Sequence, residues 1–157
     1  MNAEHINPFV QGSQNILSMV CGENTTLGKL GTKKQPCQSE EVAIKIGIVG
    51  QITGSVVFTM KQELACYIAS KMMMGMPVEQ LDDMSISAIS ELTNMISGNV
   101  ATLFSSIGVL IDITPPQFMK EPTSADFAFI PDNTLIVCIP LGFANGLTFE
   151  IHIALNN

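Results

Sequence analysis

Residues 84–107 read MSISAISELTNMISGNVATLFSSI, and the apolar side chains of this stretch recur at the three- and four-residue spacing of an α-helix. On a helical wheel they lie within about 60° of one direction. A stripe of this width is typical of a helix that packs on a sheet. The spacing therefore predicts one long helix over 84–107, with an inner face made of Ile86, Ile89, Leu92, Ile96, Val100, Leu103, Phe104 and Ile107.

The opposite face of this predicted helix is small and almost uncharged, and it consists of Ser87, Glu91, Asn94, Gly98, Ala101, Thr102 and Ser105. Glu91 is the only charged residue between Met84 and Ile111, whereas a solvated helix face normally carries several charged side chains. Such a face can lie close against another surface. Burial between two layers, or a homodimer seam, would also favour small residues, although burying an unpaired Glu91 carboxylate is strongly unfavourable. The pattern alone leaves these alternatives open.

Upstream of this helix, the sequence predicts a helix, a strand hairpin and a second helix. Asn7 and Pro8 are residue types that begin helices, and apolar residues then recur at helical spacing to Gly22. Alternating apolar residues on both sides of a glycine-containing turn are typical of a hairpin. The predicted ranges are a helix over 8–22, strands over 42–49 and 55–60, and a helix over 61–74, with an early strand allowed within 24–31.

Downstream, mostly strands are predicted, because apolar and polar residues alternate between turn signals. The predicted ranges are strands over 109–113, 127–130, 134–141 and 147–155, and a loop over 117–126. The last strand is a candidate edge strand for pairing with a second copy. This order predicts a single α+β domain over 1–157, with helices packed on one face of a largely antiparallel sheet.

Charge excludes several classes of function. The chain has a net charge of −7, with seven lysines and no arginine. A nucleic-acid binder needs a basic stripe, and adhesion to anionic membranes needs a basic surface as well, so we expect neither partner. Without arginine, bidentate recognition of phosphate is excluded. If this protein acts on a phosphate group, its partner must supply most of the positive charge.

The cysteines and histidines form no metal-binding pattern. Cys21, Cys37, Cys66 and Cys138 are far apart, with no CxxC pair, so no metal site is predicted. Because no apolar run is long enough to cross a bilayer and no secretory signal is evident, we expect a cytoplasmic protein with reduced thiols.

The segment Ser87–Asn94, SAISELTN, resembles the S/D-x3-E-x2-N signature of the CheC/CheX/FliY chemotaxis phosphatases, most closely the CheX type. The continuation at 95–101 and the opening at 6–9 are similar to the same family. Two departures matter. Pro115 and Pro116 match the family's downstream proline only approximately. The other E-x-x-N, Glu4–Asn7, precedes Pro8 and is interpreted as a helix cap and not as a second active site.

The resemblance implies a CheC-like fold and hydrolysis of the aspartyl phosphate on a CheY-like response regulator. It implies that Asn94 orients the attacking water and that Glu91 pairs with a lysine on the regulator, while Ser87 and Gly98 belong to the partner-binding face. It also implies no cofactor of the chain's own, Mg²⁺ carried by the regulator, and a homodimer. A neutral carboxamide suits this chemistry, because it both donates and accepts hydrogen bonds.

Other interpretations compete with this one. The chain could be a non-catalytic interaction module that binds a response regulator or resembles flagellar switch proteins, or a dimeric sensory domain whose seam is the 84–107 helix. His152 alternates with Glu150 on the polar side of the last strand, and the two are interpreted as an exposed or cross-strand pair and not as a catalytic dyad. Most of the methionines at 72, 73, 74 and 76 are expected to complete the core, and an adaptable binding patch is the alternative.

Overall fold

The computed structural model describes residues 3–33, 41–120 and 135–156. Within these ranges, three helices accompany one eight-stranded antiparallel sheet. The helices are α1 (Ala3–Cys21), α2 (Gln62–Met72) and α3 (Asp83–Ser106). The strands are β1 (Thr26–Leu27), β2 (Gly31–Lys33), β3 (Val42–Gly50), β4 (Thr53–Met60), β5 (Ile111–Ile113), β6 (Gln117–Lys120), β7 (Ile136–Gly142) and β8 (Thr148–Asn156).

The sheet has the strand order β1-β7-β8-β4-β3-β5, with β2 also paired to β7 and β6 also paired to β3. The predicted hairpin is present, and Val42 of β3 pairs with Met60 of β4. β8 lies between β4 and β7 and is hydrogen-bonded to both. The expectation that the last strand could serve as a free edge is therefore wrong. The free edges of the described sheet lie at β1 and β2 on one side and at β5 and β6 on the other.

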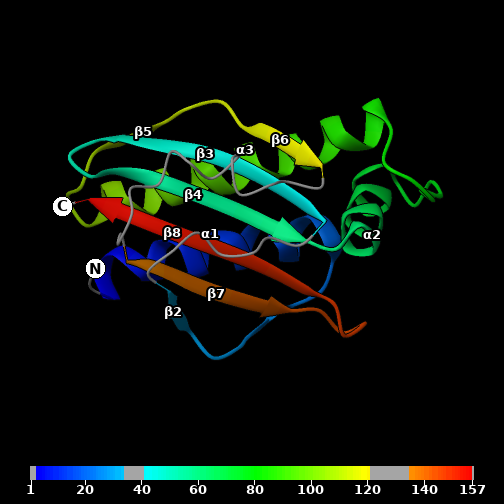
Figure 1. Ribbon diagram of the computed structural model, residues 1–157, viewed down its shortest axis with the longest axis horizontal. Coiled ribbons are helices and arrows are strands. Elements are labelled where there is room, and N and C mark those ends of the chain that lie inside the picture. Colours follow the sequence, from blue (N-terminus) through cyan, green and yellow to red (C-terminus); the bar gives the residue numbers. More distant parts are fainter. Residues whose placement is uncertain (1–2, 34–40, 121–134, 157) are drawn as a thin grey trace.

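The long helices α1 and α3 lie together against one face of the sheet, and α2 lies toward one end of the molecule (Figure 1). The core between the helices and the sheet is made of the apolar stripe of α3 and the inward residues of the central strands, among them Ile44, Phe58 and Ile151. This arrangement confirms the predicted α+β fold.

Helices α1 and α3 approach each other closely at Gly12. A Cβ atom at Gly12 would lie 2.8 Å from Cγ2 of Val100, so a larger residue there would have to displace α3. Nearby, the rings of Phe9 and Phe104 are 5.6 Å apart in an edge-to-face arrangement. These contacts hold α3 against α1, and α3 carries the predicted site residues Glu91 and Asn94.

Two predicted boundaries are wrong. α1 begins at Ala3 and contains Pro8, so Asn7 is not its cap. The turn before Pro8 stays helical because it has tertiary contacts: the ring of His5 lies 6.1 Å from that of Phe104, and Ile6 packs on the core.

Residues 117–120 are not loop but form β6, because they pair with β3 from Gln117 opposite Lys45. The predicted strand over 127–130 and the rest of the predicted loop lie outside the described residues.

Candidate active site

The start of α3 is fixed by a capping box. The Asp82 carboxylate accepts a hydrogen bond from the backbone N–H of Ser85 at 2.8 Å, and the Ser85 hydroxyl oxygen accepts one from the N–H of Asp82 at 2.7 Å. The hydrogen bonds from Ser85 lower the pKa of Asp82. The helix ends at Ser106, and Gly108 follows with a φ of +82°, which favours glycine.

The inner side of α3 is buried at five of the eight predicted positions. Ile89, Leu92, Ile96, Val100 and Phe104 have at most 1% of their surface exposed. Of the other three predicted positions, Ile86 and Leu103 are half-buried, and Ile107 is 49% exposed because it lies beyond the last helical turn.

Two buried polar residues of α3 bond to the helix itself. The Thr93 hydroxyl donates to the Ser90 carbonyl at 2.8 Å. The Ser97 hydroxyl donates to the Thr93 carbonyl at 2.6 Å. Both hydroxyls therefore have their hydrogen-bond partners within α3 itself.

The outer face of α3 carries the predicted site residues in exposed positions. Ser87, Glu91, Asn94 and Gly98 are exposed, and Ala101 is half-buried. Glu91 and Asn94 are three residues apart, which places their Cβ atoms about 5–6 Å from each other on a helix. In the part of the chain that the structure describes, neither side chain forms a hydrogen bond or an ion pair. Both are therefore available to an external partner.

A groove of about 360 Å³ runs beside Asn94 between α3 and the segment that follows it. Its α3 side carries Asn94, Ser97, Gly98 and Ala101, and its other side is formed by Ile111, Asp112, Ile113, Thr114 and Pro115. No cation is among these lining residues, and Asp112 places a carboxylate across the groove from the helix. A phosphate group that entered here would need its positive charge from elsewhere.

Sequence reasoning missed the far wall of this groove. It singled out Pro115 only as an approximate match to a family pattern, and it did not consider Asp112 or Thr114. Thr114 is held against β3, because its hydroxyl oxygen accepts the N–H of Gly47 at 2.7 Å and its own N–H donates to the Gly47 carbonyl at 3.0 Å. A side chain at Gly47 would crowd Thr114, so this glycine permits the close approach.

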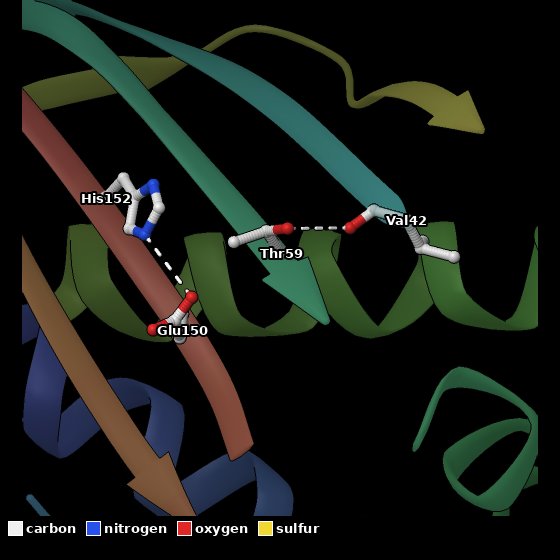
Figure 2. Close-up of polar contacts among 4 residues, drawn as sticks. All are labelled: Val42, Thr59, Glu150 and His152. Carbon is white, nitrogen blue, oxygen red and sulfur yellow. Dashed lines mark hydrogen bonds and ion pairs between the residues drawn. The ribbon is translucent and has the colours of Figure 1, made fainter. Parts of the chain in front are cut away.

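A second polar cluster lies on the face of the sheet away from α3 (Figure 2). His152 is 6% exposed, and its Nε2 lies 3.6 Å from a carboxylate oxygen of Glu150. Burial opposes the charge of His152, yet its contacts with Cys138 and Glu150 raise its pKa to about 9. On the same face, Thr59 donates its hydroxyl to the Val42 carbonyl at 2.9 Å. His152 is buried and pairs with Glu150 within β8, so the expectation of an exposed position is wrong. This cluster does not join the groove.

The second E-x-x-N segment is also separate from the groove. Glu4 and Asn7 lie in the first turns of α1, not in front of a helix, so the interpretation as a cap is wrong. His5 between them contacts Phe104, which is ten residues and therefore about 15 Å along α3 from Asn94.

In the ranges 3–33, 41–120 and 135–156, no three histidine, cysteine or acidic side chains gather as a metal site. Among the described helices, none combines the length and the apolar character needed to cross a bilayer.

Comparison with known proteins places these features in a family. The family model described as chemotaxis phosphatase CheX matches residues 42–126, which include the hairpin, α3 and the far wall of the groove. Over the full chain, the protein is 29% identical to the CheY-P phosphatase CheX of Thermotoga maritima, covering 99% of that protein.

Solved structures agree over the whole chain. A CheC-like superfamily protein from Shewanella sp. PV-4 superposes with a TM-score of 0.85 at 28% identity, covering all of both chains. The CheX chain in the CheX–CheY–BeF3–Mg²⁺ complex of Borrelia burgdorferi superposes with a TM-score of 0.77 at 26% identity, covering 98% of both chains. The resemblance drawn from residues 87–94 is therefore confirmed, and the chain belongs to the CheX family of chemotaxis phosphatases.

Proposed function

We propose that this protein hydrolyses the aspartyl phosphate of a CheY-like response regulator, with Asn94 orienting the attacking water and Glu91 docking the regulator. The observation that carries this proposal is the outer face of α3. It presents an exposed carboxylate and an exposed carboxamide, neither of them engaged within the described chain, beside a groove and among small neighbours. The relatives support the partner, since one is named a CheY-P phosphatase and another was solved with CheY.

The reaction requires this chain mainly to position the attacking water. An acyl phosphate is already activated, so the main task is to hold a water in line with the bond that breaks. The water oxygen bonds to phosphorus, the bond from phosphorus to the aspartyl oxygen breaks, and the aspartate leaves as a carboxylate. The Asn94 carboxamide accepts a hydrogen bond from the water and can donate one to a phosphoryl oxygen. The protons of the water stay on the inorganic phosphate that is released.

Charge neutralisation belongs to the partner in this proposal. The groove lacks a cation among its lining residues, and Asp112 and Glu91 add negative charge nearby. Mg²⁺ bound in the acidic pocket of the regulator would neutralise the phosphoryl oxygens. A regulator lysine would pair with Glu91 and fix the register of the two surfaces. Ser87 and Gly98, one turn on either side of Glu91 and Asn94, form the small surface that admits the regulator.

Two further assignments belong to the proposal. We propose a homodimer formed through a free sheet edge, which leaves the outer face of α3 open. We also propose a cytoplasmic location, and the free thiols of Cys21, Cys66 and Cys138 suit a reducing compartment.

The test is phosphate release from a panel of CheY-like receiver domains, each phosphorylated with a small phosphodonor in the presence of Mg²⁺. With substoichiometric amounts of this protein, we expect at least one receiver to lose its phosphoryl group much faster than it does alone. Binding without acceleration would instead support the non-catalytic interaction module. No effect on any receiver, and no binding, would overturn the proposal.

A further inference from the structure

Four methionines between the end of α2 and the start of α3 are here called the methionine patch: Met73, which is half-buried, and the exposed Met74, Met76 and Met84. Met74 is 99% exposed, Met76 56% and Met84 62%. Met73, Met76 and Met84 line a groove of about 750 Å³, together with residues of the connection between α2 and α3. This connection projects beyond the end of the sheet (Figure 1). The expectation that most of these methionines complete the core holds for Met72, which packs on it, and fails for Met74 and Met76.

The backbone holds Met74 outward. α2 ends at Met72, and Met74 follows with a φ of +61°, the only positive φ at a non-glycine residue in the described ranges. The N–H of Gly75 donates to the Ser70 carbonyl at 2.8 Å, which closes the end of the helix around this conformation. Glycine is the usual residue in such a position, because a side chain is strained there. The chain instead places a large apolar side chain there, almost fully in water.

The methionine patch is continuous with the outer face of α3. Met84, Ser87 and Glu91 follow one another at helical spacing, so Met84 lies on the same side of the helix as Glu91. Ten residues separate Met84 from Asn94, or about 15 Å along the axis. A standard interface covers about 800 Å² on each partner, which corresponds to a disc of about 16 Å radius. A receiver domain centred on Asn94 would therefore extend to Met84, at the near border of the methionine patch.

The charges around the methionine patch specify the chemistry of its partner. Glu79, Asp82 and Asp83 are exposed at its border, and none of the residues that line its groove is basic. A complementary surface would be apolar at its centre and would carry lysines at its rim. Methionine suits such a contact, because its flexible side chain adapts to the surface that it meets.

We propose that the methionine patch is a second part of the docking surface for the phosphorylated receiver domain, and that it sets the affinity and the choice of regulator while Asn94 sets the rate. This inference rests on the proposed phosphatase function. It adds an apolar contact region to the proposed interface with the receiver domain. Glu91 and the acidic border pair with basic residues of the receiver, and the methionines bury an apolar segment between those pairs.

The test compares the double variant Met74→Ser/Met76→Ser with the matched variant Leu27→Ser. Leu27 is a 43% exposed apolar residue in β1, at the sheet edge opposite β5. Dephosphorylation kinetics are measured with a receiver domain that the wild-type protein dephosphorylates. Binding is measured with the same domain loaded with beryllium fluoride and Mg²⁺. Because both changed methionines are exposed, we expect the melting transition to stay unchanged.

For the double variant, we expect KM and the dissociation constant to rise by about tenfold while kcat stays within about twofold, since partly burying two methionines supplies at least this much affinity. Leu27→Ser should match the wild type. If the wild type is active and the double variant has the same KM, the inference falls while the proposed function stands. If the double variant changes only the oligomeric state, the patch joins two copies of this chain and the inference is wrong. If the wild type neither binds nor dephosphorylates any receiver, both the proposed phosphatase function and the role of the methionine patch are wrong.

Discussion

At the scale of single residues, the proposed phosphatase function depends on two side chains that are not part of the hydrophobic core. Glu91 and Asn94 are exposed, and the stability of α3 comes from the apolar residues on its other side. Removing the functional group of Asn94 should therefore change the chemistry and leave the folded structure intact. We also expect the two residues to have separable roles, because a carboxylate can pair with a cation whereas a neutral carboxamide can both accept from and donate to the reacting groups.

Glu91 should act on binding more than on turnover. Glu91→Gln removes one ion pair, and Glu91→Lys also adds repulsion toward a regulator lysine. We expect KM for the phosphorylated regulator to increase modestly in the first variant and by at least about tenfold in the second. Steady-state kinetics at several salt concentrations would check this, since the wild-type affinity should weaken with salt. Equal KM values for the wild type and both variants would exclude the ion pair.

At the scale of elements, the shape of the outer face of α3 can be tested at Gly98. A Cβ atom at this position meets nothing within 4 Å, so a side chain is tolerated by the fold. Gly98→Ala should stabilise the helix by about 1 kcal/mol and preserve activity. Gly98→Arg should also fold but obstruct the face, and dephosphorylation should fall by at least about tenfold through KM. Full activity of the arginine variant would show that the regulator docks elsewhere.

The sequence predicts α3 to within one residue at each end because several signals agree there. The periodic stripe and Gly108 after it indicate the same element, whereas the capping role of Asp82 is evident only from the structure. The shared exposed face of the proposed site residues was predictable for the same reason, since a helical wheel places them on one side of the helix. The wheel carries no information about neighbouring elements, so the far wall at Asp112 and Thr114 was missed.

The other differences arise where tertiary contacts override local signals. Pro115 and Pro116 favour a loop after β5, yet the chain pairs with β3 from Gln117 onward. Pro8 is a typical first residue of a helix, yet contacts of His5 and Ile6 with the core keep the preceding turn helical. A run of methionines is typical of a core, and only the left-handed turn at Met74 turns part of this run toward solvent.

At the scale of the whole molecule, dimerisation and regulator binding should use different surfaces. Because β8 is central, a dimer through the described part of the sheet would use the edge near β1 and β2 or the edge near β5 and β6. Light scattering should give twice the monomer mass, and Gly98→Arg should leave that mass unchanged. A monomer at high concentration would exclude the dimer. Dissociation of the dimer by Gly98→Arg would make α3 the seam and remove the main support for the site.

The stability of the fold should depend on pH through His152. Contacts with Cys138 and Glu150 outweigh burial and raise its pKa to about 9 in the folded protein. Since the unfolded side chain titrates near about 6.5, the stabilisation is complete below that pH and is lost as pH rises through the folded value. We expect the free energy of unfolding to fall by about 2 kcal/mol between about pH 6.5 and 8.5.

Denaturant unfolding at a fixed protein concentration, with His152→Gln as the control, would measure this loss. The control should show a much flatter dependence over the same range. The Cys21 thiol, whose burial and proximity to Glu23 raise its pKa to about 11, contributes only above this window, where unfolded thiols ionise. Identical pH dependence in the two proteins would exclude His152 as the origin.

The central claim is that Asn94 performs the chemistry on a bound regulator. The most direct measurement is single-turnover dephosphorylation of a responsive receiver domain at saturating concentrations of the wild type and of Asn94→Ala, with the affinity for the beryllium fluoride form measured in parallel. We predict that the rate falls by at least about 100-fold while the affinity and the melting transition stay close to those of the wild type. A variant that dephosphorylates the bound receiver at the wild-type rate would contradict the account.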